Sequence, residues 1–317
     1  MITAVYKHQG QVHAMCLESA GVLADSFSGL LIVEAPTDYE LADIADELQI
    51  DAGNLIDAMD PNEAPRLEIH DKYDYLYVRV PSVNRRTKVV STVPMLAAYD
   101  NQRLILISSE KLKPILTGGS KIEDMIAGGS VASVLATTLN KVIDSYDYHI
   151  KEQTNAIHAM VNKIQEHKLE SEDFSSFVIL EDQIDSFVSA LTPMVPVINR
   201  LPLSVKNDNI AKSDQDLFDD AALAAQQSIN MCQANSNRIS NIRGAYETMS
   251  NNSLNRTMKT LTIATLLIAA PNLIFSMYGM NIHLPMQWNE FGFGIVVGLA
   301  ITAIVIVVLW AKKRKLF

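Results

Sequence analysis

The stretch Leu261–Asn281 reads LTIATLLIAAPNLIFSMYGMN and decides the architecture of this chain. Its residues up to Tyr278 are mostly apolar. At about 1.5 Å of rise per residue they make a helix of about 27 Å, the thickness of a bilayer's hydrocarbon core. In the closing Tyr278-Gly279-Met280-Asn281, the glycine permits a tight turn and the neutral amide of Asn281 can accept hydrogen bonds from water around a cation. The stretch predicts a membrane span that ends in a site for a hydrated metal ion.

A second uncharged apolar segment follows at Phe291–Trp310. It ends on Trp310 and is followed by Lys312-Lys313-Arg314-Lys315, an aromatic anchor and a basic cluster typical of a cytoplasmic membrane exit. The connection from Gly279 to Glu290 contains neither Lys nor Arg. We therefore expect two spans in the plasma (inner) membrane with both termini in the cytoplasm. A pair of core helices in a soluble domain is the alternative.

The composition limits the classes of partner. The net charge is −10 over 317 residues, which argues against a nucleic-acid partner and is consistent with attraction for cations or with simple solubility. Met1–Gly21 has no apolar run long enough for a signal sequence, so the chain before the first span is expected to stay in the cytoplasm. The two cysteines, Cys16 and Cys232, suggest neither a disulfide framework nor a thiolate metal site.

Residues 1–118 mix short β-rich runs with short helices, and we expect a cytosolic α/β domain there. The expected strands are Gly29–Val33, Tyr75–Val80, Thr92–Ala98 and Arg103–Ser108, and the expected helices are Tyr39–Leu48 and Asn54–Met59. The glycine pairs Gly118-Gly119 and Gly128-Gly129 lack the Lys-Ser/Thr context of a phosphate loop, which argues against an ATP-driven pump.

Residues 119–212 are expected to form a cytosolic helical hairpin, in which the second helix starts at Ser171 and ends at Pro193 and Pro196. A very long stalk helix over 213–281, N-capped by Ser213, is expected to continue as the first span at 261–278. The remaining segments are an extracellular loop at 282–290, the second span at 291–310 and a basic tail at 311–317. The fold class is thus an α+β membrane protein.

Asparagines recur along the stalk where a coiled coil would carry Leu or Ile. They are Asn230, Asn235, Asn237, Asn241, Asn251, Asn252 and Asn255. We interpret them as a face turned toward water or ions inside an assembly, with solvated outer positions as the alternative.

Polar residues also form a stripe along the first span. Thr265, Asn272 and Ser276 are seven and four positions apart and share one side of a helix. The line continues through Ala269, Leu261, Met258 and Asn255. Packing of small residues between helices would give a similar pattern, but the amide of Asn272 needs a partner in hydrocarbon and favours an aqueous path. Because two helices cannot enclose such a path, we expect a ring of identical subunits, with Leu261 as an apolar constriction.

These residues resemble the CorA family of divalent metal ion transport proteins over essentially the full chain. The resemblance is carried by Tyr278-Gly279-Met280-Asn281, by Asn255-x-x-Met258-Lys259-x-Leu261-Thr262 and by the terminal basic cluster. It implies a homopentameric funnel in the bilayer, with the long helix lining a Mg²⁺ pore and the second span forming an outer ring. The selectivity filter would lie at Gly279, Met280 and Asn281.

The resemblance extends to Asp57-Ala58-Met59-Asp60-x-x-x-x-Pro65-Arg66-x-Glu68, where it implies that Asp57 is a regulatory acid. Counting back from Asn281 places Asp220 at the partner position, so that Asp57 of one subunit and Asp220 of the next would share a regulatory Mg²⁺. The context Phe218-Asp219-Asp220-Ala221 departs from the family's pattern, and ordinary surface acids are the alternative. The loop departs as well, because Glu290 is its single acid.

Other functions remain open at this point. A Zn²⁺, Co²⁺ or Ni²⁺ transporter of the same architecture would have only His283 and Met258 as borderline or soft ligands. A membrane-tethered metal sensor that does not conduct is a further alternative. No organic cofactor is expected. The sequence carries no His-Glu-x-x-His or Gly-x-Ser-x-Gly motif, so an enzyme is not expected, and His149 and His158 are interpreted as exposed residues of one helix.

Overall fold

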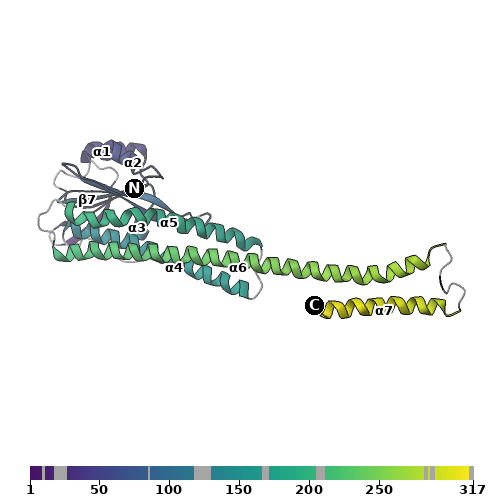
Figure 1. Ribbon diagram of the computed structural model, residues 1–317. Helices are drawn as coiled ribbons and strands as arrows, with labels where there is room; N and C mark the ends of the chain where they lie inside the picture. Colours follow the sequence, from purple (N-terminus) through teal and green to yellow (C-terminus); the bar gives the residue numbers. More distant parts are fainter. Residues whose placement is uncertain are drawn as a thin grey trace. The chain divides into compact units, whose positions relative to one another are not determined.

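The computed structural model describes residues 1–8, 11–17, 27–84, 86–117, 130–165, 171–204, 211–281, 285 and 290–313. The chain divides into two compact units, Met1–Ser240 and Asn241–Phe317. The long helix α6 (Lys212–Tyr278) contributes residues to both units (Figure 1). The expected glycine pairs after residue 117, most of the loop at 282–290 and the last four residues lie outside the described residues.

A seven-stranded sheet organises the first unit. Its strands are β1 (Ile2–His8), β2 (Gln11–Leu17), β3 (Gly29–Glu34), β4 (Arg66–Glu68), β5 (Asp74–Val83), β6 (Val90–Tyr99) and β7 (Arg103–Ser108). They are arranged in the order β2-β1-β3-β7-β6-β5-β4, and β3 and β7 pair in parallel while the other neighbours are antiparallel.

Helices cover both faces of this sheet. Along β7, Leu104 and Leu106 point to one face and Ile105 and Ile107 to the other, and all four are buried. Ile105 and Ile107 belong to the core formed with α1 (Asp38–Leu48) and α2 (Ala52–Asp57). The opposite face packs on α3 (Lys113–Thr117), α4 (Val131–Gln165) and α5 (Ser171–Ser204), as Figure 1 shows.

Local sequence explains where α1 begins. Thr37 is its N-cap and accepts a hydrogen bond from the Glu40 N–H at 3.3 Å, while the Glu40 carboxylate accepts one from the Thr37 N–H at 2.8 Å. This reciprocal pair satisfies two backbone donors that the first turn of a helix leaves free. Helix α2 uses the same device more simply, because the Asp51 carboxylate accepts from the Gly53 N–H.

Helices α4 and α5 pack together with the first part of α6. Three hydrogen bonds join α4 and its start to α6: Ser130 to Asp214 at 2.8 Å, Asn140 to the Leu217 carbonyl at 3.0 Å, and Asn235 to Thr154 at 2.8 Å. In these pairs the residue numbers increase in the same direction along both helices, so α4 and this part of α6 run parallel.

A row of buried positions on α6 follows a heptad pattern through the first unit and just beyond it. Asp214, Ala222 and Ile229 are buried as well, and the row itself consists of Phe218, Ala221, Ala225, Ser228, Cys232, Asn235, Ile239 and Ile242. Their spacing alternates between three and four residues, as in the core seam of a coiled coil. Asn235 is therefore a core residue, and our interpretation of it as part of a water-facing row is wrong. The other asparagines of that row are exposed.

Two predicted helix limits were also wrong. Helix α5 does not end at Pro193 and Pro196 but continues to Ser204. Its buried stripe continues through Met194, Ile198 and Leu201, and this packing outweighs the loss of backbone hydrogen bonds at the prolines. Helix α6 begins at Lys212, so Ser213 lies inside the first turn and is not its N-cap.

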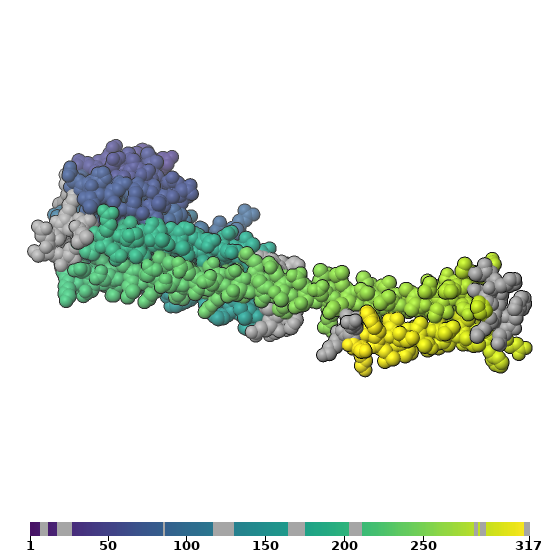
Figure 2. Space-filling view, viewed as in Figure 1, coloured from purple at the N-terminus to yellow at the C-terminus, as the bar shows by residue number. Residues whose placement is uncertain are grey.

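The second unit consists of the remainder of α6 and of α7 (Gly292–Lys313), which runs back along it (Figures 1 and 2). Both helices are long and apolar enough to cross a membrane. Val296, Ala300 and Ala311 are the buried residues of α7, and Ile263 is buried on this part of α6. Most other large apolar side chains of this unit are exposed, as expected for a surface that lipid or further helices cover.

Candidate functional site

The first part of the candidate site is the end of α6. The Gly279 N–H donates to the carbonyls of Phe275 at 2.9 Å and Ser276 at 3.2 Å, which closes the last turn of the helix. Gly279 does not have a positive φ, and a Cβ there would meet carbonyl oxygens at ordinary contact distances of 3.4 and 3.5 Å. The chain thus leaves the helix without using the conformational freedom of glycine, and Asn281 follows as an exposed residue.

The predicted pore-lining residues share one side of α6. All seven are exposed in the single chain: Asn255, Met258, Leu261, Thr265, Ala269, Asn272 and Ser276. The residues of the same stretch that are not exposed lie on the opposite side of the helix at 3.6 residues per turn; they are Ile263, Leu267, Ala270, Pro271, Ile274 and Tyr278. Because α7 packs along α6, the stripe faces away from α7 and is left for other partners.

The polar side chains of the stripe are uncharged, and their oxygens can accept hydrogen bonds from the water around an ion or bind the ion directly. The Thr265 hydroxyl donates to the Leu261 carbonyl at 2.8 Å, so its oxygen remains an acceptor for an ion or its water. Asn272 follows Pro271, which has no N–H to give to the helix. The stripe therefore offers hydroxyl and amide oxygens in sequence, with the 67% exposed Leu261 toward its N-terminal end.

The second part of the candidate site surrounds Asp57, the last residue of α2. Its Oδ2 accepts from Arg66 Nη2 at 2.8 Å, and Arg66 also pairs through Nε with Glu68 Oε1 at 2.7 Å and through Nη1 with Glu63. The guanidinium lies 3.8 Å from the centre of the Tyr77 ring. Arg66 thus joins three carboxylates and an aromatic ring, and this role was not anticipated from the sequence.

The electrostatics agree with this geometry. Burial would lower the pKa of Arg66, but its hydrogen bonds to Glu68 and Glu63 outweigh that effect and raise it. The same hydrogen bond from Arg66 lowers the pKa of Glu68. A signal for the cluster was present in the sequence, because residues i and i+2 of a strand, here Arg66 and Glu68, point to the same face.

Asp220 lies on α6 as an exposed residue next to the exposed Asp219. Among the residues that the structure describes, no three His, Cys, Asp or Glu side chains are grouped so as to hold a metal ion. The carboxylates near Asp57 surround Arg66 instead. The structure of one chain therefore does not bring Asp57 and Asp220 together as a metal site.

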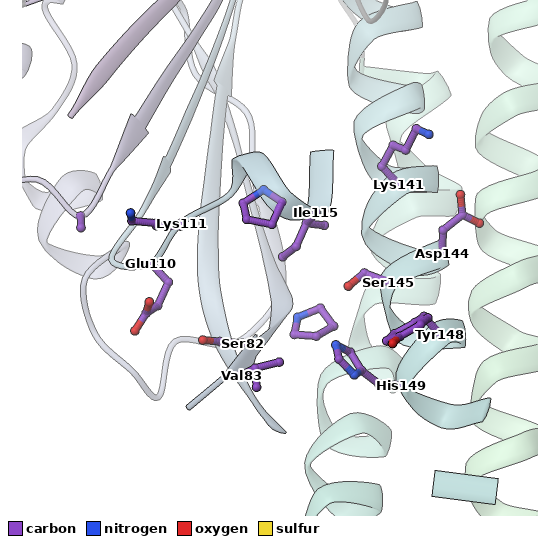
Figure 3. Close-up of a pocket in the computed structure, with 13 residues that line it drawn as sticks. Ser82, Val83, Glu110, Lys111, Ile115, Lys141, Asp144, Ser145, Tyr148 and His149 are labelled. Atoms are coloured by element: carbon purple, nitrogen blue, oxygen red, sulfur yellow. The ribbon is translucent and has the colours of Figure 1, made fainter. Parts of the chain in front are cut away.

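A cavity of about 640 Å³ lies elsewhere in the first unit, between the sheet and α4. Figure 3 shows Ser145, Tyr148 and His149 on the α4 side, with Ser82 and Val83 of β5 opposite. It collects residues at or just after the carboxyl ends of β3, β5 and β7. None of the predicted site residues lines it.

Comparisons with known proteins agree with this architecture. A family model described as CorA-like Mg²⁺ transporter protein matches residues 31–314. The cobalt/magnesium transport protein CorA of Methanocaldococcus jannaschii is 24% identical over 284 residues, which cover 86% of each chain. The complete structure of the CorA magnesium transporter from that organism has a TM-score of 0.83 at 21% identity, covering 99% of this chain and 98% of the other. Full-length CmaX has a TM-score of 0.73 at 16% identity, covering 100% and 97%.

The structural likenesses show a shared fold that includes the α/β unit, the long helix and the C-terminal apolar helix. The family model spans most of the residues, including the whole of α6 and α7. This chain therefore belongs to the CorA-like Mg²⁺ transporter family.

Proposed function

We propose that the chain is the subunit of a homopentameric Mg²⁺ channel that mediates passive influx through a pore lined by α6. The observation that carries this proposal is the exposed stripe of α6, which faces away from α7 and leads to Asn281. Copies of α6 around an axis would bring these stripes together, and the apolar remainder would contact α7 and lipid. Related proteins bear the names of magnesium and cobalt/magnesium transporters, which supports the choice of ion.

The stripe suits an ion that keeps its water. Mg²⁺ loses its hydration shell reluctantly, and neutral amide and hydroxyl oxygens can hold the hydrated ion through its water molecules. A ring of carboxylates would bind more tightly and release more slowly, whereas conduction needs weak successive sites. In this proposal Gly279, Met280 and Asn281 form the filter, Asn272 and Thr265 the next sites, and Leu261 a constriction that closes by excluding water.

The membrane potential supplies the driving force. With both termini cytoplasmic, a divalent cation entering the cell gains about 4.6 kcal/mol per 100 mV of inside-negative potential, twice the single-charge value. Gating is assigned to the cytosolic unit, where Asp57 of one subunit and Asp220 of the next hold a regulatory Mg²⁺ that keeps the pore closed. Loss of this ion leaves acids that repel one another and favours opening.

The proposal is tested by ion uptake into proteoliposomes with an imposed inside-negative potential. Asn281→Ala is expected to abolish Mg²⁺ uptake, because the ring loses its amide oxygens at the filter. Asn252→Ala is the matched control, since Asn252 is an exposed asparagine of α6 that lies off the stripe. Uptake by Asn281→Ala at the normal rate rejects the filter assignment, and loss of uptake in both variants rejects a specific role for Asn281.

Cobalt is the second candidate cargo, because the M. jannaschii relative is a cobalt/magnesium transport protein. Uptake assays with the same proteoliposomes, in which Co²⁺, Ni²⁺ or Zn²⁺ competes with Mg²⁺, distinguish a Mg²⁺ channel from a Co²⁺ transporter. A Mg²⁺ channel is expected to carry Mg²⁺ in the absence of the others. Flux of Co²⁺ or Zn²⁺ without Mg²⁺ flux would favour a transition-metal transporter.

A further inference from the structure

We propose that Arg66 is a built-in competitor of the regulatory cation. In this proposal its guanidinium forms an ion pair with the Asp57 carboxylate when no divalent ion is bound there. This ion pair sets the ion concentration at which Asp57 becomes a metal ligand. The inference rests on the regulatory role that the proposed function gives to Asp57.

The three carboxylates around Arg66 are not equivalent. The side chain of Asp57 is 46% exposed, compared with 33% for Glu68 and 16% for Glu63. Water screens an exposed ion pair most effectively, so the contact of Arg66 with Asp57 is the weakest of the three. Asp57 is therefore the carboxylate that Arg66 gives up most easily.

Arg66 stays in place when Asp57 is released. Its Nε and Nη1 remain bound to Glu68 and Glu63, and its guanidinium remains stacked on Tyr77. The Tyr77 ring is itself fixed by hydrogen bonds of its hydroxyl to the carbonyl of Asn54 at 3.2 Å and to its side-chain oxygen at 3.0 Å. Exchange of the partner of Asp57 thus breaks one partly exposed ion pair and leaves the rest of the cluster intact.

The competition is electrostatic as well as steric. Arg66 contacts Oδ2 of Asp57, so an incoming ion that uses the other oxygen still meets a full positive charge nearby. An arginine keeps this charge at every physiological pH, unlike a histidine in the same place. The charge of Arg66 therefore lowers the affinity of Asp57 for a cation by the same factor at every physiological pH. The ion binds only when its concentration is high.

The test measures how Mg²⁺ protects the cytosolic unit of the full-length protein, in detergent, from limited proteolysis. Arg66→Gln is expected to lower the Mg²⁺ concentration for half-maximal protection about two- to fivefold, the range for a partly exposed ion pair. Arg103→Gln is the matched control, because Arg103 also pairs with an acid, Asp100, at 3.0 Å and lies over a tyrosine ring, that of Tyr73. It has no contact with Asp57 and is expected to leave the midpoint unchanged.

A second variant keeps Arg66 and is expected to shift the Mg²⁺ midpoint in the opposite direction. Glu68→Gln removes one of the carboxylates that share the guanidinium, so Arg66 holds Asp57 more strongly and the midpoint is expected to rise. This variant also gives an answer if Arg66→Gln does not fold. An unchanged or raised midpoint in folded Arg66→Gln, or a lowered one in Glu68→Gln, overturns the proposal.

Asp57→Ala and Asp220→Ala separate this inference from the proposed function. If both leave the Mg²⁺ midpoint unchanged, the regulatory site itself is wrong. If they abolish protection while Arg66→Gln leaves the midpoint at the wild-type value, the site stands and only the competition by Arg66 is wrong.

Discussion

His149 shows how strongly the role of a single residue depends on packing. It was interpreted as an exposed helix residue, yet its side chain is 12% exposed and its ring lies 6.5 Å from that of Phe187. The sequence could not reveal this, because the covering atoms come from segments distant along the chain. Asp57 depends on packing in another way: its acidic character was evident, but its pairing with Arg66, nine residues along the chain, requires β4 to lie beside α2.

Burial lowers the pKa of His149 below its ordinary value of 6.5, and the hydrogen bond to Glu152 opposes the shift only in part. The unfolded chain then takes up a proton at higher pH than the folded chain does. The contribution of neutral His149 to stability is therefore complete above about pH 6.5 and is lost as the pH falls through the lower, folded-state pKa.

We expect His149→Gln to reduce the fall in melting temperature between neutral and mildly acidic pH, measured by thermal unfolding of the full-length protein in detergent. His158→Gln is the control, since His158 lies exposed on the same helix and is expected to keep the wild-type pH dependence. A fall in Tm in His149→Gln as large as that of the wild type would contradict this assignment.

At the scale of elements, periodic segments were predicted well. Strand β7 and the end of α6 occur at the predicted residues, and β3, β5 and β6 contain their predicted ranges. The hairpin of β1 and β2 was missed because polar residues such as Lys7, Gln11 and His13 interrupt the apolar runs of both strands. Helix α5 was cut short because a local rule about proline was given more weight than its continuing apolar stripe.

Asn235 is the polar member of the heptad row of α6, and its side chain is 2% exposed. It donates to Thr154 of α4 at 2.8 Å, and a polar residue at a core position fixes the register of neighbouring helices. Asn235→Ala removes this hydrogen bond and leaves a small cavity, so we expect a loss of about 1 to 3 kcal/mol in the stability of the unit Met1–Ser240.

Thermal or urea unfolding followed by circular dichroism measures this loss. Asn237→Ala, on the exposed side of α6, makes the same chemical change and is expected to alter the stability by less than about 0.5 kcal/mol. Equal effects of the two substitutions would show that Asn235 does not act as a core residue.

The whole molecule is organised by two apolar helices and by the contacts that these helices make with other copies of the chain in the proposed ring. Composition alone was enough to place two apolar helices, and the structure contains both. The ring of subunits was inferred because the two apolar helices of one chain cannot enclose an aqueous path. Such a ring depends on contacts between copies, and these are decided by shape and not by the periodicity of any one segment.

The orientation in the membrane can be tested with the two cysteines of the chain. Cys16 is exposed on β2, while Cys232 is buried in α6 and burial raises its pKa to about 12. Because the thiolate is the reactive species, a membrane-impermeant maleimide is expected to react with Cys16 and to leave Cys232 unmodified. In the proposed orientation the unit that carries Cys16 is cytoplasmic. Cys16 should therefore be labelled in inside-out vesicles and not in right-side-out vesicles, and Cys16→Ser should remove the label.

Adding Asn281→Cys to the Cys16→Ser background is expected to reverse the pattern, because the proposed orientation puts residue 281, just after the end of α6, on the far side of the membrane from Cys16. Labelling of this variant in right-side-out vesicles alone places the filter at the outer surface, where an entering ion meets it first. Labelling of Cys16 and of residue 281 from the same side would mean that α6 does not cross the bilayer, and a pore along its stripe would then be impossible.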